Sequence, residues 1–546
     1  MDNSRMCTPL WLVLTLAVIS HGFSVDPSFG GKSVYAPASV FGGKSVYSPT
    51  PSFGGKSVYT PAPSFGGKSV YTPAQGFGGK SVYSPTPSFG GKSVYTPAQG
   101  FGGKSVYSPA PSFGGKSVYA PAPSYDDAPA PAPGYYPGLS SSPSKSGSLV
   151  ERFRWRFIDY DFPSPEDRYA AMAQQLYIPE NNLPVGIEIW NNKLFVSVPR
   201  WAAGVPATLN YLPLDEAPVE EPKLIPYPDW ASNRIDDCDA LTTTYRIRVD
   251  ECDRLWVLDS GTVGIGNTTQ QVCPYAYHVF DLRTNKRIRK YQFKDDDINA
   301  DTFIANIAVD VGKTCDDTFV YASDELGYGL IVYNWLENDS WRLEHGFFQP
   351  DPLAGDFNVG GINFQWSEEG IFGMSLSAPL SNGFKTLFFH ALASNREFSV
   401  STEILRNKEK KEDNYHDFSV LPSRGPGGHV TSQTFDSNGV LFFNLVDQNS
   451  VGCWDSRKPY SKENLQVVAR DDVGLIFPSD VRVDRTSTLW VISDRMPIHL
   501  EASLDFRDVN FRIFFAPVRD LIAGTVCDSV PPVNEVKDIS QYLYYK

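Results

Sequence analysis

The sequence predicts an all-β fold, a six-bladed β-propeller, preceded by a disordered low-complexity repeat tail. Residues 149–530 repeat one sequence pattern six times: an apolar run, a polar turn and a second apolar run. Residues 25–148 are instead rich in Gly, Pro and Ser and cannot bury a core. The six turns start 48 to 68 residues apart, near Asn191, Asp250, Asp310, Glu368, Asp436 and Asp484. Such a period between short strands is typical of propeller blades, which bury their faces only against one another.

Each copy of this sequence pattern predicts a β-hairpin. In the second copy, Tyr245–Asp250 and Leu255–Asp259 alternate apolar and polar residues around a polar turn. In the fourth copy, the paired runs are expected to be Ile362–Trp366 and Ile371–Met374. Alternation of β-branched and aromatic residues indicates strands, and Gly, Asn and Asp between them indicate tight turns. A closed ring of six such blades leaves a central channel, which is the expected ligand site.

The chain is expected to begin with a secretory signal at residues 1–24. Arg5 precedes an apolar stretch from Leu10 to Ile19, and small residues follow at Gly22 and Ser24. This stretch is too short to span a bilayer, although an uncleaved anchor is the alternative. No other run reaches the roughly 18 apolar residues of a membrane helix, so no membrane partner is expected.

Residues 25–148 form the predicted tail, followed by the propeller at 149–530 and a C-terminal tail at 531–546. The unit Phe-Gly-Gly-Lys-Ser-Val-Tyr occurs eight times, spaced by 12 residues, and a Pro/Ser-rich linker follows. Little apolar area can be buried here, so the tail is expected to stay disordered or partly polyproline-II. Its regular Tyr and Lys residues suit cross-linking to extracellular matrix components, and a solvated spacer is the alternative.

The charge distribution excludes nucleic acid as a partner. The chain carries a net charge of −14, and residues 25–148 contribute about +6 (nine Lys against three Asp), which leaves −14 − 6 = −20 for residues 149–546. Phosphate binding needs basic clusters, which this acidic region does not offer.

Cysteines and sequons agree with a secreted, extracellular protein. After removal of the signal, six cysteines remain and allow 15 connectivities: Cys238, Cys252, Cys273, Cys315, Cys453 and Cys527. An even number in a secreted chain indicates disulfides. Asn267 and Asn338 begin acceptor sequons for N-glycosylation in loop-like stretches.

Polar residues at the ends of the predicted second strands are the candidate ligand site. They are Arg200, Asp259, Asp324, Glu325, Asn444, Asp447, Asp494 and Arg495. Strand ends of a ring face the mouths of its channel, where carboxylates beside aromatic rings suit a small cationic aromatic ligand. The alternative is that these groups cap hairpins and bridge blades. No cofactor or metal site is expected, because the histidines show no metal-ligand spacing and Gly-x-Ser-x-Gly is absent. The sequence therefore assigns no catalytic residue.

Several long motifs occur in order along residues 150–530. They include Trp155–Pro163, Leu183–Gly186, Leu224–Trp230, Gly261–Thr269, Asp324–Leu330 and Gly360–Trp366. In these motifs the chain resembles the Yellow / major royal jelly protein family of insects. The resemblance implies a secreted six-bladed propeller with a role in melanin pigmentation of cuticle. It also implies possible ligands, since some members bind biogenic amines and some are associated with converting dopachrome. The tandem repeats depart from the family pattern.

Three functions compete at this point. The first is a non-enzymatic extracellular protein that promotes melanin deposition by binding a catecholamine or indole in its channel. The second is a dopachrome-converting isomerase, which needs a general acid/base with a perturbed pKa facing the channel. The third is a cross-linked structural matrix or eggshell protein in which the repeats are the working part.

Overall fold

The computed structural model describes residues 148–215 and 220–528, together with short strands in the repeat segment. The signal peptide, the residues between the repeat strands and the C-terminal tail at 531–546 lie outside the described residues. The chain forms two compact units, residues 1–135 and 136–546.

The first unit contains nine short strands that recur with the 12-residue repeat. They are β1 (Lys32–Tyr35), β2 (Lys44–Tyr47), β3 (Gly55–Tyr59), β4 (Ser64–Phe65), β5 (Gly67–Tyr71), β6 (Lys80–Tyr83), β7 (Ser88–Phe89), β8 (Lys92–Tyr95) and β9 (Lys104–Val106). Seven of them form a parallel sheet in the order β1-β2-β5-β3-β6-β8-β9, and β4 pairs with β7. Identical residues face one another, as where Lys32 lies opposite Lys44. The repeat spacing therefore sets the register. These strands were not anticipated from the sequence.

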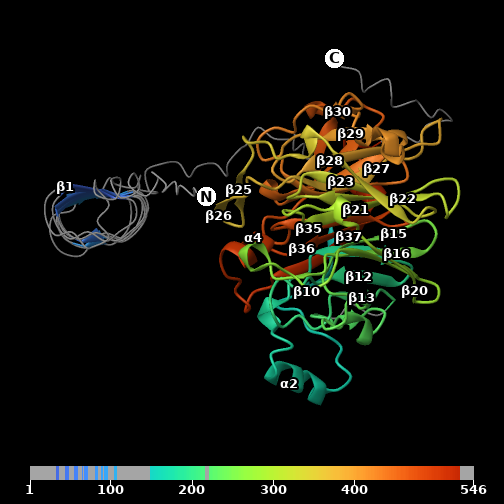
Figure 1. Cartoon of the computed structure of the whole chain (residues 1–546), viewed down its shortest axis with the longest axis horizontal. Coiled ribbons are helices and arrows are strands. Elements are labelled where there is room, and N and C mark those ends of the chain that lie inside the picture. Colours follow the sequence, from blue (N-terminus) through green and yellow to red (C-terminus); the bar gives the residue numbers. More distant parts are fainter. Residues whose placement is uncertain are drawn as a thin grey trace, which may run out of the picture. The chain divides into compact units, whose positions relative to one another are not determined.

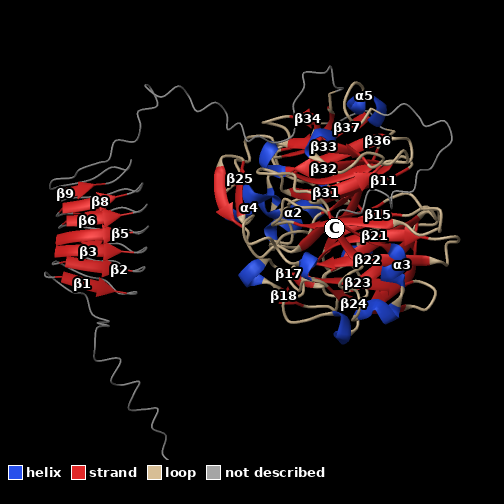
Figure 2. Ribbon diagram, turned by 90° about the horizontal axis from the view of Figure 1, so that it is seen from above, coloured by secondary structure: helices blue, strands red, loops and turns tan. Residues whose placement is uncertain are grey.

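The second unit is the six-bladed propeller, as predicted. Each blade is a four-stranded antiparallel sheet, and Figure 2 shows β31 to β34 and β21 to β24 running outward from the centre. Blade 1 has β11 (Gly186–Trp190), β12 (Lys193–Ser197), β13 (Leu209–Pro213) and β14 (Ile225–Pro226). Blade 2 has β15 (Thr244–Val249), β16 (Arg254–Asp259), β19 (Ala276–Asp281) and β20 (Lys286–Gln292). Blade 3 has β21 (Ile304–Val311), β22 (Thr318–Asp324), β23 (Gly329–Asn334) and β24 (Asp339–Glu344).

The remaining three blades complete the circle. Blade 4 has β27 (Ile371–Leu376), β28 (Thr386–Ala391), β29 (Phe398–Ser401) and β30 (Phe418–Val420). Blade 5 has β31 (Val430–Phe435), β32 (Val440–Leu445), β33 (Ser450–Asp455) and β34 (Leu465–Arg470). Blade 6 has β35 (Pro478–Val483), β36 (Thr488–Ser493), β37 (Phe511–Pro517) and β10 (Val150–Trp155). The six inner strands contact one another in sequence, and β11 contacts β35 to close the ring.

One of the six predicted hairpins is wrong. Residues Ile362–Gln365 form β26, which pairs with β25 (Asp356–Val359) in a separate two-stranded hairpin. The inner strand of blade 4 is β27, and its partner is β28 rather than the preceding run. Both hairpins show the same apolar–turn–apolar pattern, so local periodicity alone does not say which pair joins the ring.

The second unit also contains helices and a short pair of strands outside the six blade sheets. The helices are α2 (Pro165–Ala173), α3 (Thr402–Arg406), α4 (Met496–Glu501) and α5 (Val518–Ile522), and β17 (Thr262–Val263) pairs with β18 (Gln270–Gln271). Helix α2 begins with Ser164, whose hydroxyl accepts the Asp167 N–H, and with Pro165 in its first turn. It buries no residue and projects below the blades in Figure 1. Among the described residues, no helix is both long and apolar enough to cross a bilayer.

The first propeller strand in the sequence closes the last blade. Strand β10 pairs antiparallel with β37, with Glu151 opposite Phe514 and Trp155 opposite Phe511. The Glu151 carboxylate lies 3.1 Å from the Arg512 guanidinium, and Trp155 is fully buried. Blade 6 is thus built from both ends of the propeller sequence, and without residues 150–155 it lacks its outermost strand.

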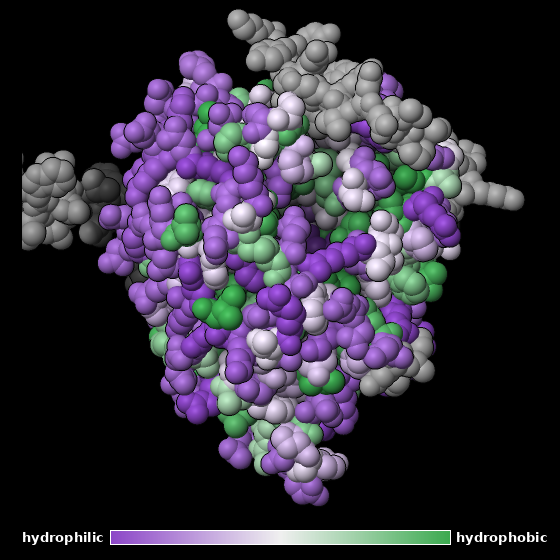
Figure 3. Space-filling view, turned by 90° about the vertical axis from the view of Figure 1, so that its right-hand side faces the viewer, coloured by the Kyte–Doolittle hydropathy of each residue, from purple (hydrophilic) through white to green (hydrophobic). Residues whose placement is uncertain are grey.

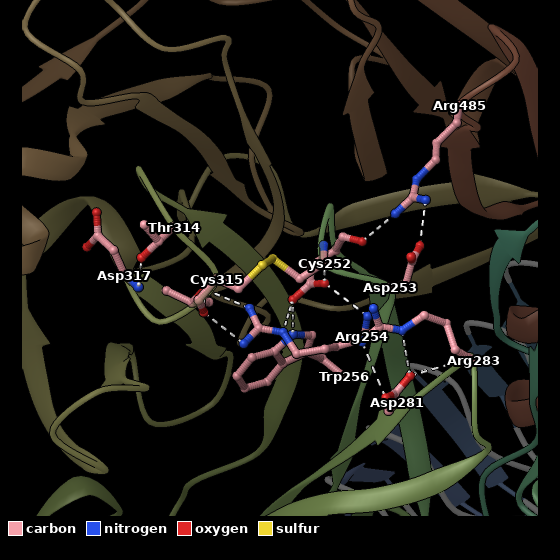
Figure 4. Close-up of a disulfide and its surroundings, with 12 residues drawn as sticks. Cys252, Asp253, Arg254, Trp256, Asp281, Arg283, Thr314, Cys315, Asp317 and Arg485 are labelled. Atoms are coloured by element: carbon pink, nitrogen blue, oxygen red, sulfur yellow. Dashed lines mark hydrogen bonds and ion pairs between the residues drawn. A yellow bond between two sulfur atoms is a disulfide. The ribbon is translucent and has the colours of Figure 1, made fainter.

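Three disulfides pair all six mature cysteines, Cys238 with Cys273, Cys252 with Cys315 and Cys453 with Cys527. Figure 4 shows the Cys252–Cys315 bridge, which joins the inner turn of blade 2 to blade 3. Beside it, Arg254 pairs with Asp250 at 2.6 Å and donates to the Cys315 carbonyl at 2.9 Å. The bridge and the arginine therefore link the same two blades, one covalently and one by a hydrogen bond.

The surface away from these links is mainly polar. Figure 3 shows a largely hydrophilic face with hydrophobic residues scattered singly over it. Isolated exposed hydrophobic residues are normal for a folded domain and do not mark an interface.

We expect the tail to be dispensable for folding and β10 to be essential. A chain starting at residue 149 should unfold at nearly the same temperature as the mature protein, because the blades begin at Val150. A chain starting at residue 157 lacks β10 and leaves β37 as an unpaired edge, so its midpoint should fall sharply. Thermal unfolding followed by circular dichroism compares the three chains. Equal midpoints for the two truncated chains would contradict the role of β10.

Peptide mapping without reduction should recover the three disulfide-linked pairs named above and no free thiol. Loss of the Cys453–Cys527 bridge, which closes 74 residues, should cost about 2–4 kcal/mol of stability, mainly through the unfolded chain. Denaturant unfolding of a Cys453→Ser/Cys527→Ser double variant measures this cost. Recovery of other pairings from the native secreted protein would refute the assignment.

Candidate functional site

Bulges in the inner strands aim polar side chains toward the ring axis. Five of the six inner strands break register near their first residues, between Thr244 and Ile247, Ile304 and Asn306, Ile371 and Gly373, Val430 and Gln433, and Pro478 and Asp480. A bulge adds one residue, bends the strand and redirects the neighbouring side chain. The bulges recur at the same end of the ring, so this end and the axis beneath it have a distinct lining.

A cluster of charged side chains fills the ring axis, and we call it the axial cluster. Its members are Glu188, Arg246, Arg248, Asp480 and Arg482, all of them buried. The Asp480 carboxylate lies 2.7 Å from Arg482 and 3.5 Å from Arg246, and it accepts the Ile187 N–H at 3.0 Å. Arg248 donates to the Asn306 amide oxygen at 2.6 Å. Buried charges require partners of this kind, because removing them from water is costly.

A second group lies at the bulged end of the axis, and we call it the mouth cluster. It comprises Tyr245, Glu325, Glu369 and Asp494. Glu325 follows β22, Asp494 follows β36 and Glu369 precedes β27, and antiparallel pairing brings these strand ends to one edge. Two backbone hydrogen bonds fix Glu325: its N–H donates to the Phe303 carbonyl, and its carbonyl accepts the Gly370 N–H. Three carboxyl groups and one phenol therefore share a small buried region.

Burial shifts the carboxyl groups of the mouth cluster toward their protonated forms. Burial, followed by the neighbouring Glu369 carboxyl, raises the pKa of Glu325 well above its usual value. Burial likewise raises the pKa of Glu369, and it raises the pKa of Asp494 to about 7. Glu325 and Glu369 hydrogen-bond to each other, as two carboxyls do when they share a proton. A carboxyl titrating near neutrality can exchange protons with a ligand at physiological pH.

Aromatic rings surround the same groups. The Tyr245 ring lies 5.2 Å from Trp201, 5.7 Å from Phe303 and 6.2 Å from Phe372, centroid to centroid. The Arg246 guanidinium lies over Tyr245 at 5.0 Å and over Phe372 at 5.6 Å. The combination of carboxyls with aromatic faces offers charge pairing to an ammonium and stacking to a ring.

Three of the sequence-predicted residues hold loops between blades. Arg200 donates to the carbonyls of Val205, Leu241 and Pro206, among others, and burial lowers its pKa to about 10. Asp259 accepts the N–H groups of Thr242, Thr243 and Gly261 at 2.7 to 2.9 Å.

The third of these residues, Asp324, makes the same kind of contact in blade 3. It accepts the Phe303 N–H at 2.9 Å and pairs with Arg342 at 2.7 Å. Gly329 makes this pair possible, since a Cβ there would lie 2.2 Å from the Arg342 guanidinium. The polar atoms of Arg200, Asp259 and Asp324 are thus engaged in contacts of the kind expected if these residues cap hairpins and bridge blades.

Three further predicted residues also lie apart from the mouth cluster. Asp447 contacts His429 at 2.6 Å, and Arg495 pairs with Asp508 at 3.0 Å. The Asn444 side chain is fully buried, with neither amide atom hydrogen-bonded among the described residues. Of the eight predicted residues, only Glu325 and Asp494 belong to the mouth cluster.

Sequence reasoning missed Tyr245, Arg246 and Glu369. Tyr245 and Arg246 lie within an inner strand, where the sequence analysis considered only strand ends. Two features of the sequence pointed to these residues. Arg246 lies inside an apolar strand, where an arginine is rarely buried without a partner, and Glu369 directly precedes a Gly at the start of a strand. The predicted glycosylation positions are both exposed, with Asn267 in a turn at Gly266–Thr268 and Asn338 in the turn before β24.

Comparisons with known proteins place the chain in a family. The model of the major royal jelly protein family matches residues 242–527. Protein yellow of Drosophila madeirensis is 57% identical over 390 residues, covering 71% of this chain and 69% of that protein. Protein yellow of Drosophila melanogaster is 57% identical over 382 residues, covering 70% and 71%. The chain belongs to the major royal jelly protein family, and it is similar to the yellow proteins of Drosophila over about 70% of its length.

Solved structures give a weaker match. Virginiamycin B lyase from Staphylococcus aureus is 10% identical with a TM-score of 0.34, covering 62% of this chain and 95% of that chain. A luciferin-regenerating enzyme is 13% identical with a TM-score of 0.34, covering 62% and 91%. A similarity of this size says nothing about activity.

We expect Asp494 to make stability fall as pH rises through neutrality. Its folded-state pKa of about 7 lies above its unfolded value, so the folded protein binds more protons between roughly pH 4 and 7. Stability is therefore highest while Asp494 is protonated and is progressively lost toward pH 7. The Asp494→Asn variant should lose this part of the pH dependence. Denaturant unfolding at pH 4.5 to 8 measures it.

Asp505→Asn is the matched control for this comparison. Asp505 is exposed, and its hydrogen bond with Arg507 lowers its pKa to about 2. Its own contribution to the pH dependence of stability therefore falls below the tested pH range. Parallel stability–pH curves for the wild type and the Asp494→Asn variant would show that Asp494 does not titrate there.

Proposed function

We propose that the protein is secreted and promotes melanin pigmentation of insect cuticle by binding a catecholamine or indole melanin precursor at the mouth cluster. The observation that carries this proposal is the grouping of Glu325, Glu369 and Asp494 beside the Tyr245–Trp201–Phe303–Phe372 rings. The family membership and the similarity to protein yellow support it, as do the three disulfides, which are typical of extracellular proteins.

The chemistry of the mouth cluster fits a cationic aromatic ligand. An ammonium group would pair with a carboxylate while the catechol or indole ring packs against the aromatic faces. Burial raises the pKa of all three carboxyls and so favours their neutral forms, whereas pairing with a cation requires one of them to be ionised. Amine binding should therefore release a proton and tighten as pH rises through the Asp494 pKa of about 7.

The carboxyl pair also favours a second candidate, the isomerisation of dopachrome. Tautomerisation moves one proton between two positions of the substrate and needs no redox partner. Two carboxyls sharing a proton can supply both the base and the acid, provided that both contact the substrate. Glu325 and Glu369 are the groups that would take these roles, with Asp494 as an alternative base.

One experiment separates these functions. The purified mature protein is incubated with dopamine and with dopachrome, while calorimetry follows binding heat and absorbance follows dopachrome loss. Binding heat without accelerated loss supports the binding function. Accelerated loss that disappears in the Glu325→Gln variant supports the isomerase. Neither signal would refute both functions and leave the structural matrix role, in which the repeat tail is the working part.

We expect the Glu325→Gln and Asp494→Asn variants to bind dopamine more weakly. Each change keeps the side-chain shape and removes one charge, and a charge-assisted hydrogen bond is worth roughly 1.5–3 kcal/mol, so affinity should fall about 10- to 150-fold for the carboxyl that pairs with the amine. Calorimetry in two buffers of different ionisation enthalpy measures affinity and proton release together. The Asp505→Asn variant should bind as the wild type does. Unchanged affinity in both mouth-cluster variants would assign these carboxyls a purely structural role.

A further inference from the structure

Positive charge exceeds negative charge in the axial cluster. Its three guanidiniums, from Arg246, Arg248 and Arg482, face two carboxyl groups, from Glu188 and Asp480. All five side chains are at most 9% exposed, so water does not screen the difference. Burial also raises the pKa of Glu188, which weakens its contribution as a counter-charge. At least one positive charge on the ring axis is therefore uncompensated by the cluster itself.

Arg248 is the guanidinium without a counter-ion. Its two terminal nitrogens donate to the Ile247 carbonyl and the Asn306 amide oxygen, both at 2.6 Å and both uncharged. Within residues 148–215 and 220–528, no carboxylate oxygen lies within the 4.0 Å of an ion pair from it. Burial, together with the neighbouring Arg482, lowers the pKa of Arg248 to about 9. Every other arginine of the axial cluster has a carboxylate oxygen within 4 Å.

Unused donors occur in the same cluster. The Nε–H groups of Arg246 and Arg482 are buried and have no hydrogen-bond partner among the described residues. The Arg482 Nε lies 3.8 Å from the Glu188 carboxylate, which is beyond hydrogen-bond distance. An unmade hydrogen bond from a buried charged group is expensive, and such groups usually contact an ion or ordered water.

The position on the axis is shared by several blades. Arg246 starts from β15, passes beside blade 1 and donates to the Ser479 carbonyl of blade 6 at 2.8 Å. Arg248 reaches from β15 to Asn306 in blade 3. The donors thus reach the ring axis from two blades, Arg246 and Arg248 from β15 of blade 2 and Arg482 from β35 of blade 6.

We propose that the axial cluster binds one small monovalent anion, chloride above all, between the guanidiniums of Arg246, Arg248 and Arg482. The anion neutralises the excess charge of Arg248 and accepts the unused Nε–H groups. The anion is opposite in charge to the ligand of the mouth cluster, and its binding does not depend on the proposed amine binding, although Arg246 borders both clusters with its guanidinium 5.0 Å from the Tyr245 ring.

Halide titration of the full mature protein tests the site. Thermal unfolding is measured as chloride replaces gluconate at constant ionic strength. A ligand that binds only the folded state stabilises it by mass action, so above the dissociation constant each tenfold rise in chloride should raise the folding equilibrium constant about tenfold. Bromide should act in the same way, and in a bromide-soaked crystal it should give an anomalous peak between the three guanidiniums. A midpoint that is identical in chloride and gluconate would overturn the proposal.

Arg248→Gln is the decisive variant. It keeps a donor for Asn306 and removes the uncompensated charge, so the folded protein should no longer respond to chloride. The matched control is Arg485→Gln, which alters an exposed arginine paired with Asp253 and should respond as the wild type does. A chloride response that survives in Arg248→Gln would overturn the proposal. If Arg248→Gln does not fold, the bromide peak in the wild type decides: a peak elsewhere, or none, refutes the site.

Discussion

Closure of the ring is the constraint on which the rest of the structure depends, and β10 supplies the outer strand of the last blade at the seam. The axial cluster takes Glu188 from blade 1, Arg246 and Arg248 from blade 2, and Asp480 and Arg482 from blade 6. Blades 1 and 6 become neighbours only when the circle is complete, as the hydrogen bond from Ile187 N–H to Asp480 shows. An open ring would leave these charges without their partners. Backbone pairing at the seam and charge pairing on the axis therefore stabilise the same closed state.

The closed ring also creates the electrostatics of the mouth cluster. Glu325, Glu369 and Asp494 come from blades 3, 4 and 6, and far from one another in water each would ionise at acidic pH. Bringing them together away from solvent raises the pKa of each and favours the neutral forms. The protein thereby spends folding stability to hold carboxyls with raised pKa values, which is common in sites that bind or transform ligands.

Periodicity was sufficient to predict the fold, and it was insufficient to predict the site. Five of the six hairpins could be recognised because each buries two strands with alternating residues. The fourth failed because the β25–β26 hairpin carries the same pattern outside the ring. For the site, strand ends led to Glu325 and Asp494, which lie in the mouth cluster. The same criterion selected Arg200 and Asp259, whose atoms are occupied by loop backbone. Distinguishing these cases requires knowing which bulge turns which side chain toward the axis, and that depends on the partner strand.

The chain order gives β10 a mechanical significance. The repeat tail leads through residue 149 directly into this strand, whose hold on the ring includes the ladder to β37 and the bond from the Asn510 N–H to the Trp155 carbonyl. Any tension on a tail attached to a solid matrix reaches these bonds before it reaches any other blade. The strength of an anchorage through the tail is thus limited by the pairing of this outer strand in the last blade.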